Sequence, residues 1–159
     1  MDYKKVILLA AIITVVLAGS ACASKLDYIG GANPETGIEI AGIEFNIPDG
    51  YLKNDSKSIV NQSNSTGDDS FVVNQETFVN VNGEEIVITI VDFDEFDVDA
   101  QMLHRICEGV DEKTLMGYPG YISDNNASVQ FTYAYDNRAV SITASCEELI
   151  NQVLVVEDA

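Results

Sequence analysis

The sequence predicts an α+β protein: an antiparallel sheet built from an N-terminal strand and two hairpins, with two helices packed on it, after an N-terminal signal or anchor segment. Two observations predict the sheet. The dipeptides Asn82-Gly83 and Asp136-Asn137 are each flanked by residues that alternate between apolar and polar, which is typical of a β-hairpin. The helices are predicted by apolar residues spaced three or four apart after each hairpin.

The N-terminal segment has the pattern of a signal peptide or a membrane anchor. Lys4 and Lys5 precede an uncharged apolar run from Val6 to Ala18, and small residues follow that run. With those small residues included, its length reaches the lower limit for a membrane-spanning helix. The predicted limits are 1–24 for this segment, 25–37 for a polar tether and 38–157 for a single α+β domain.

Three fates of this segment stay open. Ala21-Cys22-Ala23 fits a cleavage site, which would release a secreted protein. Alternatively, Cys22 is the acylated first residue of a lipoprotein, or residues 6–23 remain as a membrane anchor. All three place residues 25–159 on the far side of a membrane, so the predicted location is extracytoplasmic, on the cell surface or secreted.

The first strand is predicted in the stretch that contains Ile38, Ile40, Ile43, Phe45 and Ile47. The alternation slips at Ala41-Gly42 and then resumes, which predicts a bulge at the glycine. Residues 52–70 show no sustained apolar period and are predicted to form a long exposed loop.

The two hairpins come with predicted registers. A two-residue turn at Asn82-Gly83 pairs Val81 with Glu84, Val79 with Ile86 and Thr77 with Ile88. A turn at Asp136-Asn137 pairs Tyr135 with Arg138, Tyr133 with Val140, Phe131 with Ile142 and Val129 with Ala144. In both hairpins the apolar partners then share one face of the sheet.

The two helices are predicted from their apolar stripes. The first covers about Asp99 to Val110, with Met102, Leu103, Ile106, Cys107 and Val110 on one side. A turn-rich passage follows it. The second helix is predicted to open with a capping box of Ser145 and Glu148, and its buried stripe is Cys146, Leu149, Ile150 and Val153.

Cys107 and Cys146 both lie on these apolar stripes, so the two side chains are candidates to meet in the core. Outside the cell an isolated pair of cysteines favours a disulfide. The alternative is two buried free thiols, because cysteine packs as a small hydrophobic residue. No C-x-x-C motif is present, so redox catalysis has no support.

The chain is strongly acidic, with 8 basic and 26 acidic residues and a net charge of −18. Phosphate binding needs a basic surface, so a nucleic-acid partner is excluded. The charge favours solubility, and the alternative is weak binding of cations or basic partners. Four N-x-[ST] sequons are candidates for glycosylation: Asn54, Asn61, Asn64 and Asn126.

The densest acidic stretch, IVDFDEFDVDA, joins the first hairpin to the first helix. Its carboxylates are Asp92, Asp94, Glu95, Asp97 and Asp99. No glycine interrupts it, as an EF-hand loop would require, and Asp97 or Asp99 is explained by capping of the helix. The stretch is therefore interpreted as a solvated connector, with a weak metal site as the alternative.

No residue pattern predicts catalysis. His104 is the sole histidine and is expected on the solvent side of its helix, and neither H-E-x-x-H nor G-x-S-x-G occurs. We expect no cofactor. One stretch gathers aromatic residues, and its binding-surface candidates are Tyr118, Tyr121, Tyr135 and Arg138, which would line a groove for a sugar or peptide. The alternative is a tight turn whose tyrosines cover the edge of the sheet.

Several short motifs together resemble a known group of proteins. GIEFNIPDGY, TLMGYPGY, FTYAYDNRAVSITAS and LINQVL look like the small exported, lipoprotein-like domains of methanogenic archaea, and more distantly like the Mog1/PsbP/LpqN α+β fold. The resemblance covers most of residues 38–156 and includes no catalytic signature.

These observations predict a non-enzymatic, surface-tethered or secreted accessory domain that binds a protein or glycan. Its contacts with the membrane would be residues 6–23 or an acylated Cys22. The alternative is an extracellular calcium-binding module that uses the acidic stretch from Asp92 to Asp99. An enzyme ranks third.

Overall fold

The computed structural model describes residues 36–66 and 68–156. The predicted signal or anchor segment, Cys22 and most of the tether lie outside these residues. Among the described helices, none has the length and apolar character needed to cross a membrane.

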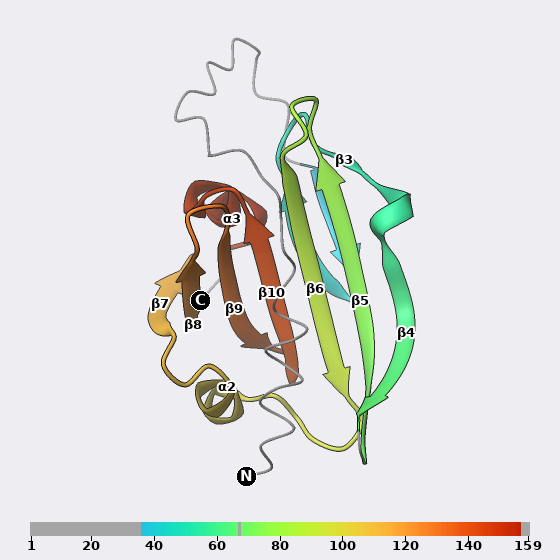
Figure 1. Ribbon diagram of the computed structural model, residues 1–159, viewed down its shortest axis with the longest axis vertical. Coiled ribbons are helices and arrows are strands. Elements are labelled where there is room, and N and C mark those ends of the chain that lie inside the picture. Colours follow the sequence, from blue (N-terminus) through green and yellow to red (C-terminus); the bar gives the residue numbers. More distant parts are fainter. Residues whose placement is uncertain (1–35, 67, 157–159) are drawn as a thin grey trace.

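The protein is α+β, with antiparallel strands and two α-helices (Figure 1). The strands and helices are β1 (Thr36–Ile40), β2 (Ile43–Ile47), β3 (Leu52–Lys53), β4 (Ile59–Thr66), β5 (Asp69–Val79), β6 (Glu85–Phe93), α2 (Ala100–Ile106), β7 (Asp111–Leu115), β8 (Tyr118–Asp124), β9 (Val129–Tyr135), β10 (Arg138–Ala144) and α3 (Glu147–Val153), with a short 3-10 helix at Asp55–Lys57. In the described part, β1 and β2 form a sheet of their own. The other eight strands form the large sheet in the order β3-β5-β6-β10-β9-β8-β7, with β4 also paired to β5.

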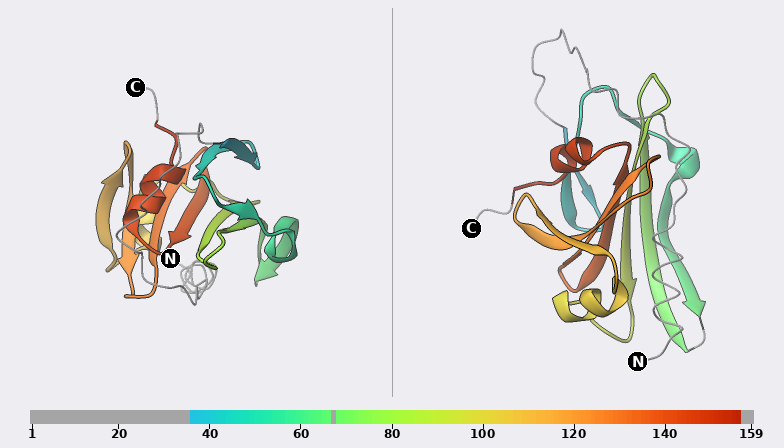
Figure 2. Two further views of the ribbon diagram at one scale, coloured as in Figure 1. Left: turned by 90° about the horizontal axis from the view of Figure 1, so that it is seen from above. Right: turned by 60° about the vertical axis from the view of Figure 1, so that its left-hand side comes forward.

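Both faces of the large sheet are packed, because side chains alternate along its strands. Ile86, Ile88 and Ile90 of β6 contribute to the larger core, which also contains residues of α3 and of the small sheet. Val91 and Phe93 of the same strand contribute to a second core with α2. The two helices therefore pack on opposite faces of the large sheet. They also lie at opposite ends of its strands (Figures 1 and 2).

The second predicted hairpin is confirmed residue for residue. β9 and β10 pair Tyr135 with Arg138 and Val129 with Ala144, and Asp136 and Asn137 adopt the positive φ angles of 49° and 60° that a two-residue turn needs. The register sends Phe131 and its partner Ile142 into the larger core, where both are fully buried.

The first hairpin exists, but its predicted register is wrong by one residue. Phe78, not Val79, pairs with Ile86. The reason lies in the loop, where the side chain of Asn80 accepts hydrogen bonds from the backbone N–H groups of Asn82 (2.9 Å) and Glu84 (3.0 Å). This Asx-type bonding favours a longer loop than the two-residue turn.

Two predictions about the N-terminal half are also wrong. The slip at Ala41-Gly42 is a complete turn rather than a bulge, since the two residues have φ angles of 49° and 81° and connect β1 to β2. The stretch 52–70 is not a loop, because it contains β3, the 3-10 helix and β4. Its polar sequence fits a strand at the edge of the sheet, which pairs on one side only.

The turn-rich passage after α2 contains a hairpin that the sequence analysis missed. β7 and β8 are joined by Met116 and Gly117, which have φ angles of 51° and 94°. Four of the five residues of β7 are exposed. The strand therefore lacks the alternation of apolar and polar residues that predicts a half-buried strand.

The helices are shorter than predicted. α2 ends at Ile106, and of its predicted stripe Leu103 and Cys107 are buried, whereas Val110 is 38% exposed. The buried stripe of α3 is confirmed, since Leu149, Ile150 and Val153 lie in the core. The predicted capping box is wrong, because α3 begins one residue later with Cys146 at its N-cap, and the Ser145 hydroxyl makes no hydrogen bond.

The predicted disulfide between Cys107 and Cys146 is not formed, because Cys107 is a free cysteine. Cys107 follows α2 in the second core, and Cys146 precedes α3 in the larger core. The large sheet lies between the two cores. Apolar stripes on two helices bring cysteines together only when both helices cover the same face.

We expect Cys107 to be alkylated by iodoacetamide without any reductant, but only after unfolding. Burial raises the pKa of its thiol to about 11, so the reactive thiolate is scarce in the native protein. Because the pKa of Cys107 is higher in the folded than in the unfolded chain, burial of the neutral thiol contributes fully to the free energy of unfolding below pH 9. That contribution is lost as the pH rises toward about 11. Peptide mapping checks the labelling, and modification that requires prior reduction would contradict it.

Candidate functional site

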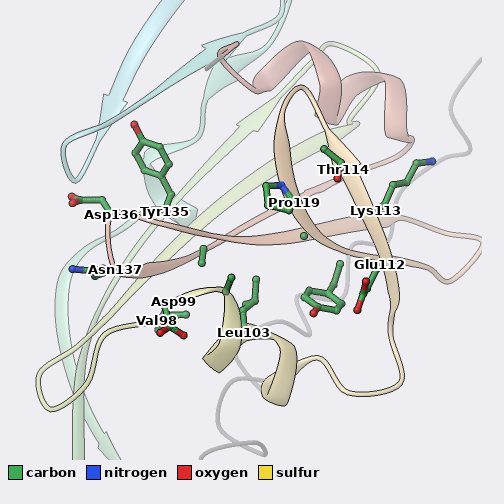
Figure 3. A pocket seen from close by; sticks show the side chains of 14 residues that line it. Val98, Asp99, Leu103, Glu112, Lys113, Thr114, Pro119, Tyr135, Asp136 and Asn137 are labelled. Carbon is green, nitrogen blue, oxygen red and sulfur yellow. The ribbon is translucent and has the colours of Figure 1, made fainter. Parts of the chain in front are cut away.

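A groove with a volume of about 520 Å³ lies on the α2 face of the large sheet, at the side of β7 (Figure 3). Its floor is made by β8 and β9. One wall is the start of α2, the other is β7, and the β9–β10 turn closes one end. We take this groove as the candidate functional site, because ligands bind preferentially in concave, partly apolar surfaces with a few polar groups.

Hydrogen bonds hold the α2 wall in place. The side chain of Asp99 is the N-cap of α2 and accepts a hydrogen bond from the backbone N–H of Met102 (2.7 Å). The backbone N–H of Val98 donates to the carbonyl of Asn137 in the β9–β10 turn (2.8 Å). Leu103 is buried against the sheet below. These contacts fix the width of the groove at the end where the turn lies.

The strand register decides which side chains face the groove. Tyr121 belongs to the core on the α2 face, and its partner in β7 is Glu112. Pro119 and its partner Thr114 lie two residues further along the same strands and so share that face. Lys113 points to the opposite face, where its Nζ donates to Glu147 Oε2 of α3 (2.7 Å). Figure 3 shows the Lys113 side chain directed away from the groove.

At the β7 end of the groove three polar side chains meet. The hydroxyl of Tyr121 lies 2.7 Å from Nδ1 of His104, and Oε1 of Glu112 lies 3.3 Å from the same nitrogen. Burial, and then the charge of Glu112, raise the pKa of Tyr121. The phenol therefore keeps its proton at neutral pH, and the tautomer of His104 decides which of the two atoms donates the hydrogen bond. His104 is exposed, as predicted, but it is engaged in this cluster.

This cluster is suited to binding rather than to nucleophilic chemistry. A catalytic histidine activates a nearby nucleophile, and the neighbour of His104 is a phenol whose pKa is raised. The nearby thiol of Cys107 is buried, with a pKa raised to about 11. Both groups are poor nucleophiles at neutral pH, whereas the exposed carboxylate of Glu112 is a hydrogen-bond acceptor for a ligand.

Of the four predicted binding-surface residues, Tyr121 and Tyr135 are among those that line the groove, whereas Tyr118 and Arg138 are not. Tyr121 lies on the α2 face, whereas Tyr118 and Tyr135 pack on the larger core, with their ring centroids 5.9 Å apart. Figure 3 shows the ring of Tyr135 directed away from the groove. Arg138 donates to the carbonyl of Ala41 and to Asp136, and so ties the small sheet to the β9–β10 turn.

The acidic stretch has the geometry of a connector. The predicted capping role of Asp99 is confirmed, and Asp94 accepts a hydrogen bond from the hydroxyl of Ser70 (2.6 Å). Phe93 and Phe96 stack with their centroids 4.5 Å apart and hold the stretch against the second core. Across residues 36–66 and 68–156, no three His, Cys, Asp or Glu side chains are grouped closely enough to hold a metal ion.

Three of the four sequons lie near the β4 edge, opposite the groove. Asn54 is the N-cap of the 3-10 helix, where its side chain accepts a hydrogen bond from Ser56. Asn61 is exposed at an irregularity of β4, with a φ of 47°, and Asn64 follows it in the same strand. Asn126 is exposed in the turn between β8 and β9. Whether any of them carries a glycan stays a prediction.

No sequence pattern indicated Glu112, Pro119, Asp136 and Asn137 as lining residues of the groove. The only local signal was the proximity of charged residues to the tyrosine-rich stretch. The pairing of β7 with β8 decides which of these residues share a face with Tyr121.

Comparison of the chain with protein-family models, with curated proteins and with solved structures gives no match.

Proposed function

We propose that this chain is an exported, surface-tethered or secreted accessory domain that acts by binding a partner molecule in the groove and catalyses no reaction. The observation that carries the proposal is the composition of the groove. Its apolar floor includes Pro119 and Ala134, and its rim carries the carboxylates of Asp99 and Glu112. Such a surface contributes both desolvation and directional hydrogen bonds to a ligand.

Two further observations support a binding role. The sole histidine of the chain, His104, is bonded to a protonated tyrosine and lies beside a carboxylate, so its Nδ1 has its partners within the protein. The strand that forms one wall of the groove, β7, also presents a row of exposed residues to a partner. Export is supported by the sequence of the first 24 residues, with its two lysines, apolar run and small residues.

The experiment is cell fractionation, followed by intact-mass measurement of the native protein and an activity screen of the same sample. We expect the protein in the membrane or extracellular fraction, with a mass that reports cleavage, acylation and glycosylation together. We expect no turnover of generic ester, peptide or glycoside substrates. Full-length protein in the cytosolic fraction, or turnover that is lost in His104→Ala and kept in Arg105→Ala, would contradict the proposal.

A further inference from the structure

β7 is the most accessible pairing edge of the large sheet. It is the last strand in the sheet order and is paired by β8 on one side within the described chain. Asp111, Glu112, Lys113 and Thr114 are all exposed. The opposite edge, β4, has an irregular register between Ile59 and Gln62, a feature that discourages pairing with another chain. β7 has a regular register and no proline, so its unpaired backbone groups remain available to a further strand.

Two of the three carboxylates that line the groove, those of Asp99 and Glu112, form no ion pair with a lysine or arginine of the described chain. Asp136 pairs with Arg138 (2.7 Å), and Lys113 pairs with Glu147 on the opposite face. Asp99 accepts its hydrogen bond from a backbone N–H, and Glu112 lies beside the exposed ring of His104. A cationic ligand would therefore reach these two carboxylates without displacing a lysine or an arginine.

The position of Glu112 in β7 places one of these carboxylates directly beside the unpaired edge of the sheet. Glu112 is in β7 itself and faces the groove, so the residue opposite it on an added strand would have its Cβ atom roughly 5 Å away. A lysine or arginine at that position would lay its aliphatic stem over the floor near Pro119 and its charged group beside Glu112. On the other face of the same strand, Lys113 is already bonded to Glu147.

We infer that the groove and β7 together bind a basic, extended peptide segment of a partner protein. The segment adds a strand to β7 and places a lysine or arginine side chain against Glu112. This inference rests on the proposed binding function and names the ligand class. The net charge of −18 attracts a basic partner over a longer range and thereby speeds its association.

The test is fluorescence anisotropy of the full chain with a labelled peptide of about eight residues in which lysine and threonine alternate. Two further peptides carry glutamine or glutamate in place of lysine, and a fourth is the lysine peptide with alternate backbone nitrogens methylated. We expect saturable binding of the lysine peptide at physiological salt, with the glutamine, glutamate and methylated peptides bound much more weakly.

Glu112→Gln should weaken binding of the lysine peptide about tenfold, since it removes the charge opposite the ligand. Glu108→Gln is the matched control, because Glu108 is equally an exposed glutamate near α2 but does not line the groove. We expect the control to bind like the unaltered chain. Both positions are exposed, so neither change threatens the fold.

Several results would overturn the inference while leaving the proposed function intact. Equal binding of the glutamine peptide would mean that charge does not select the ligand. Equal binding of the methylated peptide would exclude strand addition, and an equal loss in Glu108→Gln would mean that only overall charge matters. A dimer in sedimentation that Thr114→Pro disrupts would mean that β7 pairs with a second copy.

Absence of any peptide binding would refute the inference. The proposed function, by contrast, is refuted only by a cytosolic location of the protein or by turnover of a substrate.

Discussion

Gly120→Ala should lower the free energy of unfolding by about 3 kcal/mol, the upper part of the range for overpacked cores. Gly120 is buried in β8, and a Cβ atom there would lie 2.4 Å from the carbonyl oxygen of Thr132 and 2.7 Å from Cζ of Phe131. The first contact is with the backbone of β9, which is hydrogen-bonded on both sides by β8 and β10. The strand can move only by breaking that pairing. Urea unfolding monitored by circular dichroism measures the change.

Gly37→Ala is the matched control for this substitution. Gly37 is also a strand residue, but a Cβ atom built there meets no other atom within 4 Å. We expect its unfolding free energy to change by less than about 0.5 kcal/mol, as for surface substitutions in general. Comparable losses in both variants would show that the cost does not come from the contact with β9.

Phe45→Ala should cost about 3–5 kcal/mol, the typical loss for a buried phenylalanine. Phe45 in β2 is fully buried in the larger core and forms an isolated bridge with Leu154, which follows α3. The small sheet shares no strand pairing with the large sheet in the described chain, so its attachment depends strongly on apolar packing. Removing the ring leaves a cavity between β2 and α3, and thermal and urea unfolding both report the loss.

Glu44→Ala tests whether this effect belongs to the core. Glu44 is the neighbour of Phe45 in the same strand, and its side chain is exposed. We expect Glu44→Ala to change the free energy of unfolding only slightly. If Phe45→Ala is as stable as Glu44→Ala, the small sheet does not contribute to the cooperative unit, and the larger core does not extend to β2.

A hairpin register could be predicted where the turn residues and the apolar alternation of both strands agree. The β9–β10 register was predicted in full, because Asp136 and Asn137 tolerate the positive φ angles of the turn and the apolar residues on both sides alternate in phase. The β5–β6 register was missed by one residue, because the side chain of Asn80 competes for the backbone N–H groups of the turn. Asx bonding of this kind changes a loop length without changing the hydrophobic pattern.

The groove could not be predicted from short stretches of sequence, because its residues come from strands that are brought together by pairing. Tyr121 and Glu112 are nine residues apart and meet only because β7 pairs with β8. Tyr121 and Tyr135 both lie in strands of the same sheet, yet they point to opposite faces. A one-residue difference in strand position moves a side chain from one face to the other, so proximity in sequence did not predict a shared surface.

By itself, the sequence determined the acidic character of the protein, its α+β class, the hairpin around Asp136-Asn137 and the buried stripe of α3. Each of these depends on residues that are close in the chain, through turn geometry or side-chain periodicity. The tertiary structure decided that α2 and α3 cover opposite faces, that Cys107 stays a free thiol, and that His104, Tyr121 and Glu112 meet beside an accessible edge. These features depend on the order and register of strands that are distant in sequence, and that order is fixed by the packing of the whole sheet.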